Sequence, residues 1–241
     1  MRNRIIVAFL TVVIICPALR AQNLWTSVEM KTKVAQGLNA FAEGEFRTHD
    51  GLSSTERWSG TIGMDYKALH FLKLTGGYTY IHQQTEQKIT QKGNIIPPYW
   101  QPKHRAFFAV TGIYEWKRFT FSLRERYQYT YRKEQYVPKF DEDGITPKDD
   151  EWVESKGKHI LRSRLEVEYN IRKSKFKPFA SYEIYNSLSD GFAVDKARYT
   201  MGTEYKFNKK HSVSLFYRYI DKTDEDEASG HVIGIGYKFK L

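Results

Sequence analysis

The stretch from Arg118 to Tyr131 reads RFTFSLRERYQYTY, and its side chains change character at every step. The odd positions are mostly large and apolar: Phe119, Phe121, Leu123, Glu125, Tyr127, Tyr129 and Tyr131. The even positions are polar: Arg118, Thr120, Ser122, Arg124, Arg126, Gln128 and Thr130. Because successive side chains of a strand point to opposite faces, this stretch predicts a β-strand with one apolar and one polar face.

The same alternation recurs over most of the chain. Eleven segments show it, and they begin near Leu24, Leu38, Trp58, Phe71, Arg105, Arg118, Leu161, Lys177, Ala197, His211 and His231. Most run for about 10 to 14 residues, which exceeds the usual strand of a soluble protein and suits a tilted strand that crosses a membrane. The fold class predicted is therefore all-β, a single closed antiparallel transmembrane β-barrel.

Connections between these segments alternate between short and long. The long ones cover residues 49–55, 83–101, 133–157 and 223–230. This is typical of outer-membrane barrels, with short periplasmic turns and longer extracellular loops. Bacterial barrels usually have an even number of strands, so we expect ten or twelve. A strand would then be missed near the N-terminus or in 133–157, or Leu24–Lys33 would not span.

The N-terminal segment has the layout of a secretory signal peptide. Two arginines precede an apolar run from Ile5 to Cys16, and small residues follow up to Ala21. The run is too short for a membrane helix, so we expect cleavage after Ala21 and a barrel over 22–241. The mature chain then carries no cysteine, and its net charge falls from +10 to +7.

Composition excludes a bundle of membrane helices. Charged residues make up 27% of the chain, and no later apolar stretch reaches spanning length. Seventeen tyrosines and fifteen phenylalanines without long apolar runs favour strands with one apolar face. Tyrosines near strand ends, such as Tyr78, Tyr80 and Tyr127, are typical of an aromatic girdle.

The polar face carries arginines and glutamates that could pair across a lumen. The predicted lumen charge network comprises Glu43, Glu45, Arg47, Arg124, Arg126, Arg162, Arg164, Glu166, Glu168, Glu183, Arg198, Glu204 and Arg218. A soluble periplasmic lipid-binding barrel would show the same alternation with the polar face outward, and this alternative stays open. The terminal pattern Gly234, Tyr237 and Phe239 is similar to the insertion signal of outer-membrane barrels. It favours the polar lumen.

The chain also resembles a known family. The residues concerned are the segments 24–29 (LWTSVE), 43–47 (EGEFR), 76–80 (GGYTY), 123–128 (LRERYQ) and 178–185 (PFASYEIY). They are similar to an uncharacterised outer-membrane β-barrel family of Bacteroidetes, domain of unknown function 2490 (DUF2490). The resemblance implies the location and the fold, and it brings no activity with it.

No arrangement of residues predicts catalysis. None of the seven histidines stands beside a serine elbow, and His82 and Ser163 are weak candidates for a lipid hydrolase. We therefore expect no enzyme, no catalytic residue and no cofactor. The acidic loop from Asp141 to Gly144 lacks the context of a calcium loop, so no metal site is assigned.

Two residues of a long loop, Tyr99 and Trp100, could contact a ligand or partner. Basic residues are spread over the strands, which argues against nucleic acid. The expected partners are outer-membrane lipid and lipopolysaccharide, and the barrel assembly machinery through the C-terminal strand, with the chain a monomer. The sequence favours a structural or small-solute transport role with a largely filled lumen, and loop-mediated binding at the cell surface is the alternative.

Overall fold

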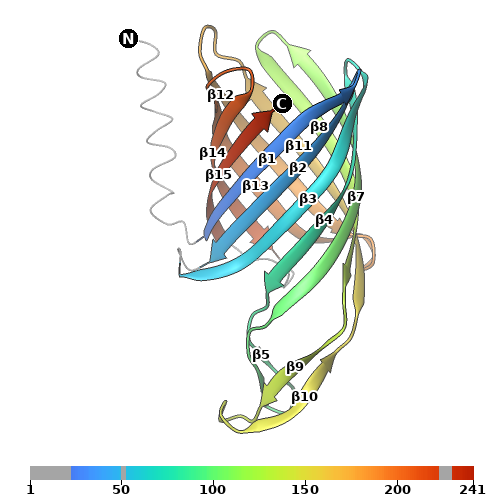
Figure 1. Ribbon diagram of the computed structural model, residues 1–241, viewed down its shortest axis with the longest axis vertical. Coiled ribbons are helices and arrows are strands. Elements are labelled where there is room, and N and C mark those ends of the chain that lie inside the picture. Colours follow the sequence, from blue (N-terminus) through green and yellow to red (C-terminus); the bar gives the residue numbers. More distant parts are fainter. Residues whose placement is uncertain (1–22, 50–52, 223–229) are drawn as a thin grey trace.

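The computed structural model describes residues 23–49, 53–222 and 230–241. The predicted signal peptide, residues 1–21, lies outside the described residues. Within them no helix is long and apolar enough to cross a membrane. The described chain is built from strands, and most of them join one closed barrel (Figure 1).

Eleven strands form the barrel in the part of the chain described. They are β1 (Asn23–Ala35), β2 (Leu38–His49), β3 (Ser54–Leu69), β4 (Leu72–Gln84), β7 (Trp100–Trp116), β8 (Phe119–Arg132), β11 (Lys156–Tyr169), β12 (Phe176–Ser187), β13 (Ala193–Lys206), β14 (His211–Lys222) and β15 (Gly230–Lys240). Around the barrel they follow the order β1-β15-β14-β13-β12-β11-β8-β7-β4-β3-β2. Each matches one of the eleven alternating segments, so the predicted fold class is confirmed.

The expectation of an even strand number was wrong. Strands joined by successive hairpins alternate in direction, so the first and last of an odd set run the same way. β1 and β15 accordingly close the barrel as a parallel pair, from Asn23 opposite Val232 to Lys31 opposite Lys240. β1 is also a full strand, paired along its length with β2. The barrel therefore tolerates one parallel seam.

Short turns and long connections lie at opposite ends of the barrel. The end that carries the turns β1–β2, β3–β4 and β7–β8 is called the short-turn end, and the other the long-loop end (Figure 1). Two connections at the long-loop end contain strands that the sequence did not predict: β5 (Lys88–Ile89), β6 (Ile95–Ile96), β9 (Gln135–Phe140) and β10 (Pro147–Val153). They form a four-stranded sheet in the order β10-β9-β6-β5, which projects beyond the barrel (Figure 1).

The apolar face of the barrel points outward. Leu123 and Leu165 are 53% and 50% exposed, and Ile62 is 63% exposed. The charged residues at the alternate positions, such as Arg198 and Glu183, are buried inside. This confirms a polar lumen, the reverse of what a soluble lipid-binding barrel requires.

Aromatic side chains gather on the outer face near both ends. The long-loop belt includes Trp58, Tyr78, Tyr80, His82, Trp100, His104, Tyr127, Tyr129, His159, Tyr217, Tyr219 and His231. The short-turn belt includes Tyr114, Trp116, Phe119, Phe121, Tyr169, Phe176, Tyr205, Phe207, His211, Tyr237 and Phe239. Two such belts flank the apolar band of a membrane barrel.

Four phenylalanines inside the lumen lie against glycines of the next strand. The directly opposed pairs are Phe41 and Gly63, Phe107 and Gly77, Phe179 and Gly202, and Phe216 and Gly234. A Cβ atom at Gly234 would lie 1.9 Å from Cζ of Phe216, and one at Gly63 would lie 2.6 Å from Cζ of Phe41. Each glycine therefore leaves room for a ring that fills part of the lumen.

We expect Gly234→Ala to lower the free energy of unfolding by about 1–3 kcal/mol, because the new methyl group overpacks the ring of Phe216. Urea unfolding of the purified barrel in detergent measures the loss. Gly60→Ala is the matched control, since a Cβ there meets nothing within 4 Å. Adding Phe216→Ala to Gly234→Ala should recover part of the loss. An equal loss of stability in Gly234→Ala and Gly60→Ala would contradict this packing.

Candidate functional site

A cavity of about 1230 Å³ occupies the long-loop half of the lumen. Its walls reach from mid-barrel, at Glu43, Arg124 and Arg164, to the long-loop rim, at Arg132 and Lys156. The basic residues of the wall are Arg47, Arg57, Lys88, Lys103, Arg105, Arg124, Arg126, Arg132, Lys156, Lys158, Arg162, Arg164, Lys196, Arg198 and Arg218. The acidic ones are Glu43, Glu45, Glu56, Glu86 and Glu183. Fifteen cations face five carboxylates, so the cavity has a large positive excess.

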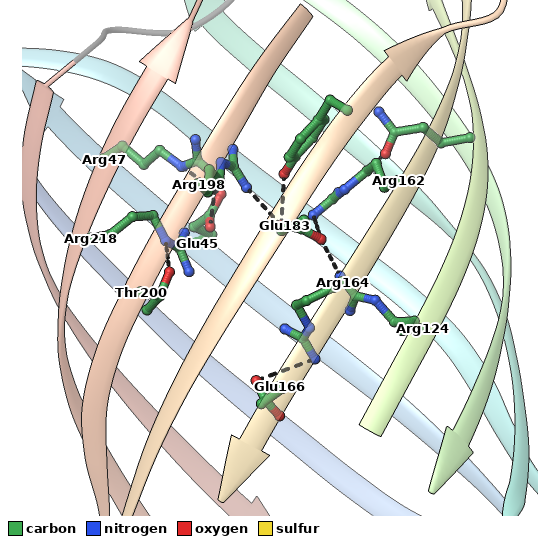
Figure 2. A network of polar contacts seen from close by, with 12 residues as sticks. Glu45, Arg47, Arg124, Arg162, Arg164, Glu166, Glu183, Arg198, Thr200 and Arg218 are labelled. Carbon is green, nitrogen blue, oxygen red and sulfur yellow. Dashed lines mark hydrogen bonds and ion pairs between the residues drawn. The ribbon is translucent and has the colours of Figure 1, made fainter. Parts of the chain in front are cut away.

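Glu183 of β12 is the centre of one cluster in this wall (Figure 2). Its Oε1 accepts hydrogen bonds from Nη2 of Arg124 at 2.6 Å and from Nη2 of Arg162 at 2.9 Å. Its Oε2 lies 3.6 Å from Nη1 of Arg198 and accepts a hydrogen bond from the Tyr185 hydroxyl at 3.1 Å. One carboxylate thus serves three guanidinium groups from β8, β11 and β13.

Glu45 of β2 is the centre of a second cluster. Arg47 donates to both of its oxygens, from Nε at 2.9 Å and from Nη2 at 3.1 Å. Arg57 of β3 donates from Nη2 at 2.7 Å. Both arginines are buried. Again a single carboxylate neutralises more than one arginine, and positive charge is left over.

Trp25 joins these arginines across the parallel seam. Its side chain is 3% exposed and packs with Ile220 and Val232. The guanidinium carbon of Arg47 lies 3.4 Å from the ring centroid, and those of Arg218 and Arg198 lie at 5.0 Å and 5.3 Å. Cations over an indole face are attracted by its negative quadrupole. The ring therefore holds three arginines without neutralising any of them.

Arg126 packs on an aromatic ring. Its guanidinium carbon lies 3.7 Å from the ring centroid of Phe107, and among the described residues it forms no ion pair with a carboxylate. Its Nε is buried without a hydrogen-bond partner in the described part of the chain. Arg126 also lines the cavity, so its guanidinium is placed to receive an anion from solution.

Polar pairs fill the short-turn half of the lumen, below the cavity. Lys31 pairs with Asp65, and Lys177 pairs with Glu168. Nη2 of Arg164 lies 3.7 Å from Oε2 of Glu166 (Figure 2). This pair lies at the boundary between the two halves. Together with the rings of Phe41 and Phe179, these pairs narrow the path through the barrel.

The structure brings most of the predicted network together. Glu43, Glu45, Arg47, Arg124, Arg126, Arg162, Arg164, Glu183, Arg198 and Arg218 line the cavity, and Glu166 and Glu168 form the pairs below it. Arg218 donates from Nε to the Thr200 hydroxyl at 2.9 Å. Glu204 stands opposite Lys177 in the register, but the ion pair of Lys177 is with Glu168.

Sequence reasoning missed ten of the twenty charged residues in the cavity wall and two of the aromatic rings against them. Arg57, Lys196, Trp25 and Tyr185 line the cavity or pack against its arginines. The alternation could have identified Arg57, because it lies an even number of residues from Ser59 and Asp65 and so shares their face of the strand. Trp25 stands at the start of a strand whose assignment was open, and no pattern in its own segment shows which ring will meet the arginines.

A family model described as "Protein of unknown function (DUF2490)" matches residues 22–228. The chain belongs to this family. The predicted resemblance to DUF2490 is thereby confirmed, and no curated protein matches the chain. Membership carries no activity, so the role of the cavity rests on its own geometry.

Several solved barrels are similar to this chain at low sequence identity. The translocator domain of autotransporter NalP from Neisseria meningitidis superposes with a TM-score of 0.56 and 11% identity, covering 87% of this chain and 76% of its own. The beta domain of the Bordetella autotransporter BrkA superposes with a TM-score of 0.50 and 11% identity, and the match covers 86% of this chain and 83% of that domain. The NanC porin superposes with a TM-score of 0.48 and 13% identity, and the match covers 92% of this chain and 100% of the porin. At these identities the two autotransporter domains show a common fold alone.

The predicted loop contacts and the two hydrolase candidates lie in different parts of the barrel. Trp100 begins β7 and stacks on His82 with ring centroids 4.8 Å apart, so it belongs to the long-loop belt. Tyr99 lines the cavity and exchanges hydrogen bonds with Thr85. His82 lies in that belt on β4, whereas the hydroxyl of Ser163 on β11 donates to Glu125 at 2.6 Å. The structure does not bring His82 and Ser163 together.

The acidic loop is a turn between β9 and β10. The Asp143 carboxylate accepts hydrogen bonds from the hydroxyl of Thr146 at 2.6 Å and from the backbone amides of Ile145 and Thr146 at 2.9 Å. These bonds, that of the Thr146 hydroxyl first, lower the pKa of Asp143 to about 2. Asp141 pairs with Lys148 at 2.9 Å. Both carboxylates are used within the turn, and the described residues contain no metal-binding group of three or more ligands.

Glu183→Gln should lower the free energy of unfolding by about 3–5 kcal/mol, because three buried guanidinium groups would lose their shared charge partner. Urea unfolding in detergent measures this change. Glu166→Gln is the matched control: its one pair is long and partly exposed, so we expect a change of about 1 kcal/mol or less. Equal effects at the two positions would show that Glu183 is not the centre of the network.

Proposed function

We propose that this chain is an outer-membrane barrel that binds small anionic solutes in the long-loop half of its lumen and passes at most small ones. The observation that carries the proposal is the excess of fifteen lysines and arginines over five glutamates in the cavity wall. In this reading the short turns are periplasmic and the long loops extracellular, so the cavity faces the outside of the cell.

The outer face supports a membrane location. Exposed aliphatic side chains such as Ile62 and Leu165 would be costly in water, and they lie between two aromatic belts. The fold shared with the autotransporter domains agrees with this. In the proposed setting the band contacts outer-membrane lipid and lipopolysaccharide. The barrel assembly machinery would engage β15, whose Tyr237 and Phe239 lie in the short-turn belt.

The cavity would act on anions through its field and its donors. Like charges lining a concave wall of low dielectric focus their potential, and this raises the local concentration of anions. Guanidinium groups then present paired N–H donors that match carboxylate and phosphate oxygens. The filled short-turn half limits what can continue through the barrel. No step of this role needs bond chemistry, a cofactor or a metal.

In planar bilayers with a KCl gradient, the purified chain should give small steps whose reversal potential indicates chloride over potassium. Arg126→Glu should reduce or invert this preference, because it replaces by an acid a guanidinium of the cavity wall that forms no ion pair with a carboxylate among the described residues. Arg172→Glu, in the connection β11–β12, is the control and should leave selectivity unchanged. Cation selectivity in the wild-type chain would contradict the proposal.

Electrical silence would favour the second candidate, ligand or partner binding through the projecting sheet. Tyr136 and Trp152 carry that alternative, because they are 68% and 47% exposed with ring centroids 4.6 Å apart on β9 and β10. Binding that is lost on changing both rings to serine would then identify a surface receptor.

Leu165→Arg tests the membrane location. A charge facing hydrocarbon should cost about 2–4 kcal/mol at mid-membrane depth and block assembly, as seen by loss of the faster-migrating unboiled band on a detergent gel. Arg164→Ala, one position away and facing the lumen, should still insert. Normal assembly of Leu165→Arg would instead indicate a soluble barrel.

A further inference from the structure

Four arginines form a square on two adjacent strands at the mid-barrel end of the cavity. Arg126 of β8 stands directly opposite Arg162 of β11, and Arg124 stands directly opposite Arg164. Residues two apart on a strand share a face, so the four side chains enter the same part of the lumen, and all four line the cavity. Figure 2 shows Arg124, Arg162 and Arg164 around Glu183. The four residues are called the arginine square.

The arginine square is electrostatically unfavourable by itself. Like charges directly opposite on neighbouring strands repel each other, and water screens this repulsion poorly inside a protein. The charged groups that act most strongly on Arg126 are Arg162, Arg124 and Arg105, and all three are cations. A network that only filled the lumen would alternate in sign, as the lysine–acid pairs of the short-turn half do. The square therefore has a requirement that lumen filling does not explain.

Carboxylates neutralise only part of the square. Glu183 pairs with two of its arginines, but it is also shared with Arg198, which lies outside the square. Nη2 of Arg164 lies 3.7 Å from Oε2 of Glu166. Arg126 forms no ion pair with a carboxylate among the described residues. Four positive charges thus meet at most two negative ones, and an excess of two positive charges remains.

The square also has hydrogen-bond donors to spare. The Nε atoms of all four arginines are buried without a hydrogen-bond partner in the described part of the chain. Each guanidinium carries five N–H donors. Among the described residues the four groups make three hydrogen bonds, from Arg124 and Arg162 to Glu183 and from Arg162 to Gln128. Most of the donors are therefore left for a solute in the cavity.

We infer that the arginine square binds a doubly charged phosphoryl group, carried by inorganic phosphate or by a phosphomonoester. Two negative charges match the excess of the square, whereas chloride or a monocarboxylate supplies one. A phosphoryl group presents its acceptor oxygens around a single atom, and guanidinium groups bind such oxygens in bidentate pairs. The cavity continues from the square to the long-loop rim, so the remainder of an ester would lie there. The inference rests on the proposed function and names its ligand class.

Titration calorimetry of the purified barrel in detergent tests the ligand class, at about pH 8, where phosphate is mostly doubly charged. At constant ionic strength, phosphate should bind at a single site and about tenfold or more tightly than acetate, because it forms more charge-assisted hydrogen bonds. Succinate carries its two charges on separate carboxylates and should also bind more weakly than phosphate. Acetate or succinate that binds as tightly as phosphate would overturn the inference.

Glycerol 3-phosphate distinguishes the two sources of the phosphoryl group in the same titration. Binding tighter than that of inorganic phosphate would assign a phosphomonoester, because the remainder of the molecule then gains contacts in the cavity. Weaker binding would assign free phosphate.

Arg126→Gln is the test variant, because Arg126 has no carboxylate pair to lose and its removal relieves repulsion in the square. It should weaken phosphate binding about tenfold or more, while the barrel keeps its resistance to heat in detergent. Arg132→Gln is the matched control: it removes the same charge from the cavity wall on the same strand, roughly 20 Å nearer the rim. It should weaken binding by about threefold or less, since it acts through the general field alone. Arg164→Gln is a second test variant with the same expected result as Arg126→Gln.

The outcomes separate the arginine square from the proposed function. Equal losses of phosphate binding in Arg126→Gln and Arg132→Gln would show that the general field of the cavity attracts phosphate, which overturns the square and leaves the proposed function standing. Loss of heat resistance in both Arg126→Gln and Arg164→Gln would show that the square serves stability, and it would overturn the inference as well. A folded wild-type barrel that binds no anion would overturn both the square and the proposed function.

Discussion

Charge neutralisation inside a closed space is the constraint on which this structure depends. Every second residue of each strand points into the lumen, and many of these residues are arginines or lysines. A buried guanidinium needs a counter-charge or an aromatic face, and carboxylates are in short supply. Glu183 and Glu45 therefore each pair with several arginines. The ring of Trp25 contacts three guanidinium groups. The cavity stays positive because its wall has more arginines and lysines than carboxylates.

The sequence was sufficient for properties that follow from local periodicity. Leu123 and Arg124 take opposite faces because they are neighbours in an extended strand, whatever lies around them. This rule placed eleven strands, the apolar outer band and most of the lumen network. It also placed Glu125 on the apolar face, although one carboxylate in an apolar row could not show by itself what it contacts.

Other features depend on relations between distant residues, and periodicity does not contain these. Lys177 faces Glu204 across one pair of strands but binds Glu168 across the other, a choice that the fit inside the lumen decides. The strand number depends on how β1 meets β15, so the usual even count was a poor guide. The strands β9 and β10 lie in a segment rich in charge and turn residues, where alternation is weak. The contact of Trp25 with three arginines likewise depends on strands that are distant in the sequence.

The parallel seam also has a consequence for how the molecule reaches its native state. Every other pair of barrel neighbours is joined by a connection within one region of the chain, so those pairs can form early at a small cost in chain entropy. The seam pairs residue 23 with residue 232 and closes the longest loop in the protein. Before it forms, β1 and β15 are two open edges of a curved sheet, each with unsatisfied backbone groups. Chain entropy thus favours late closure of this seam, and open edges of this kind are exposed to pairing with other chains until they close.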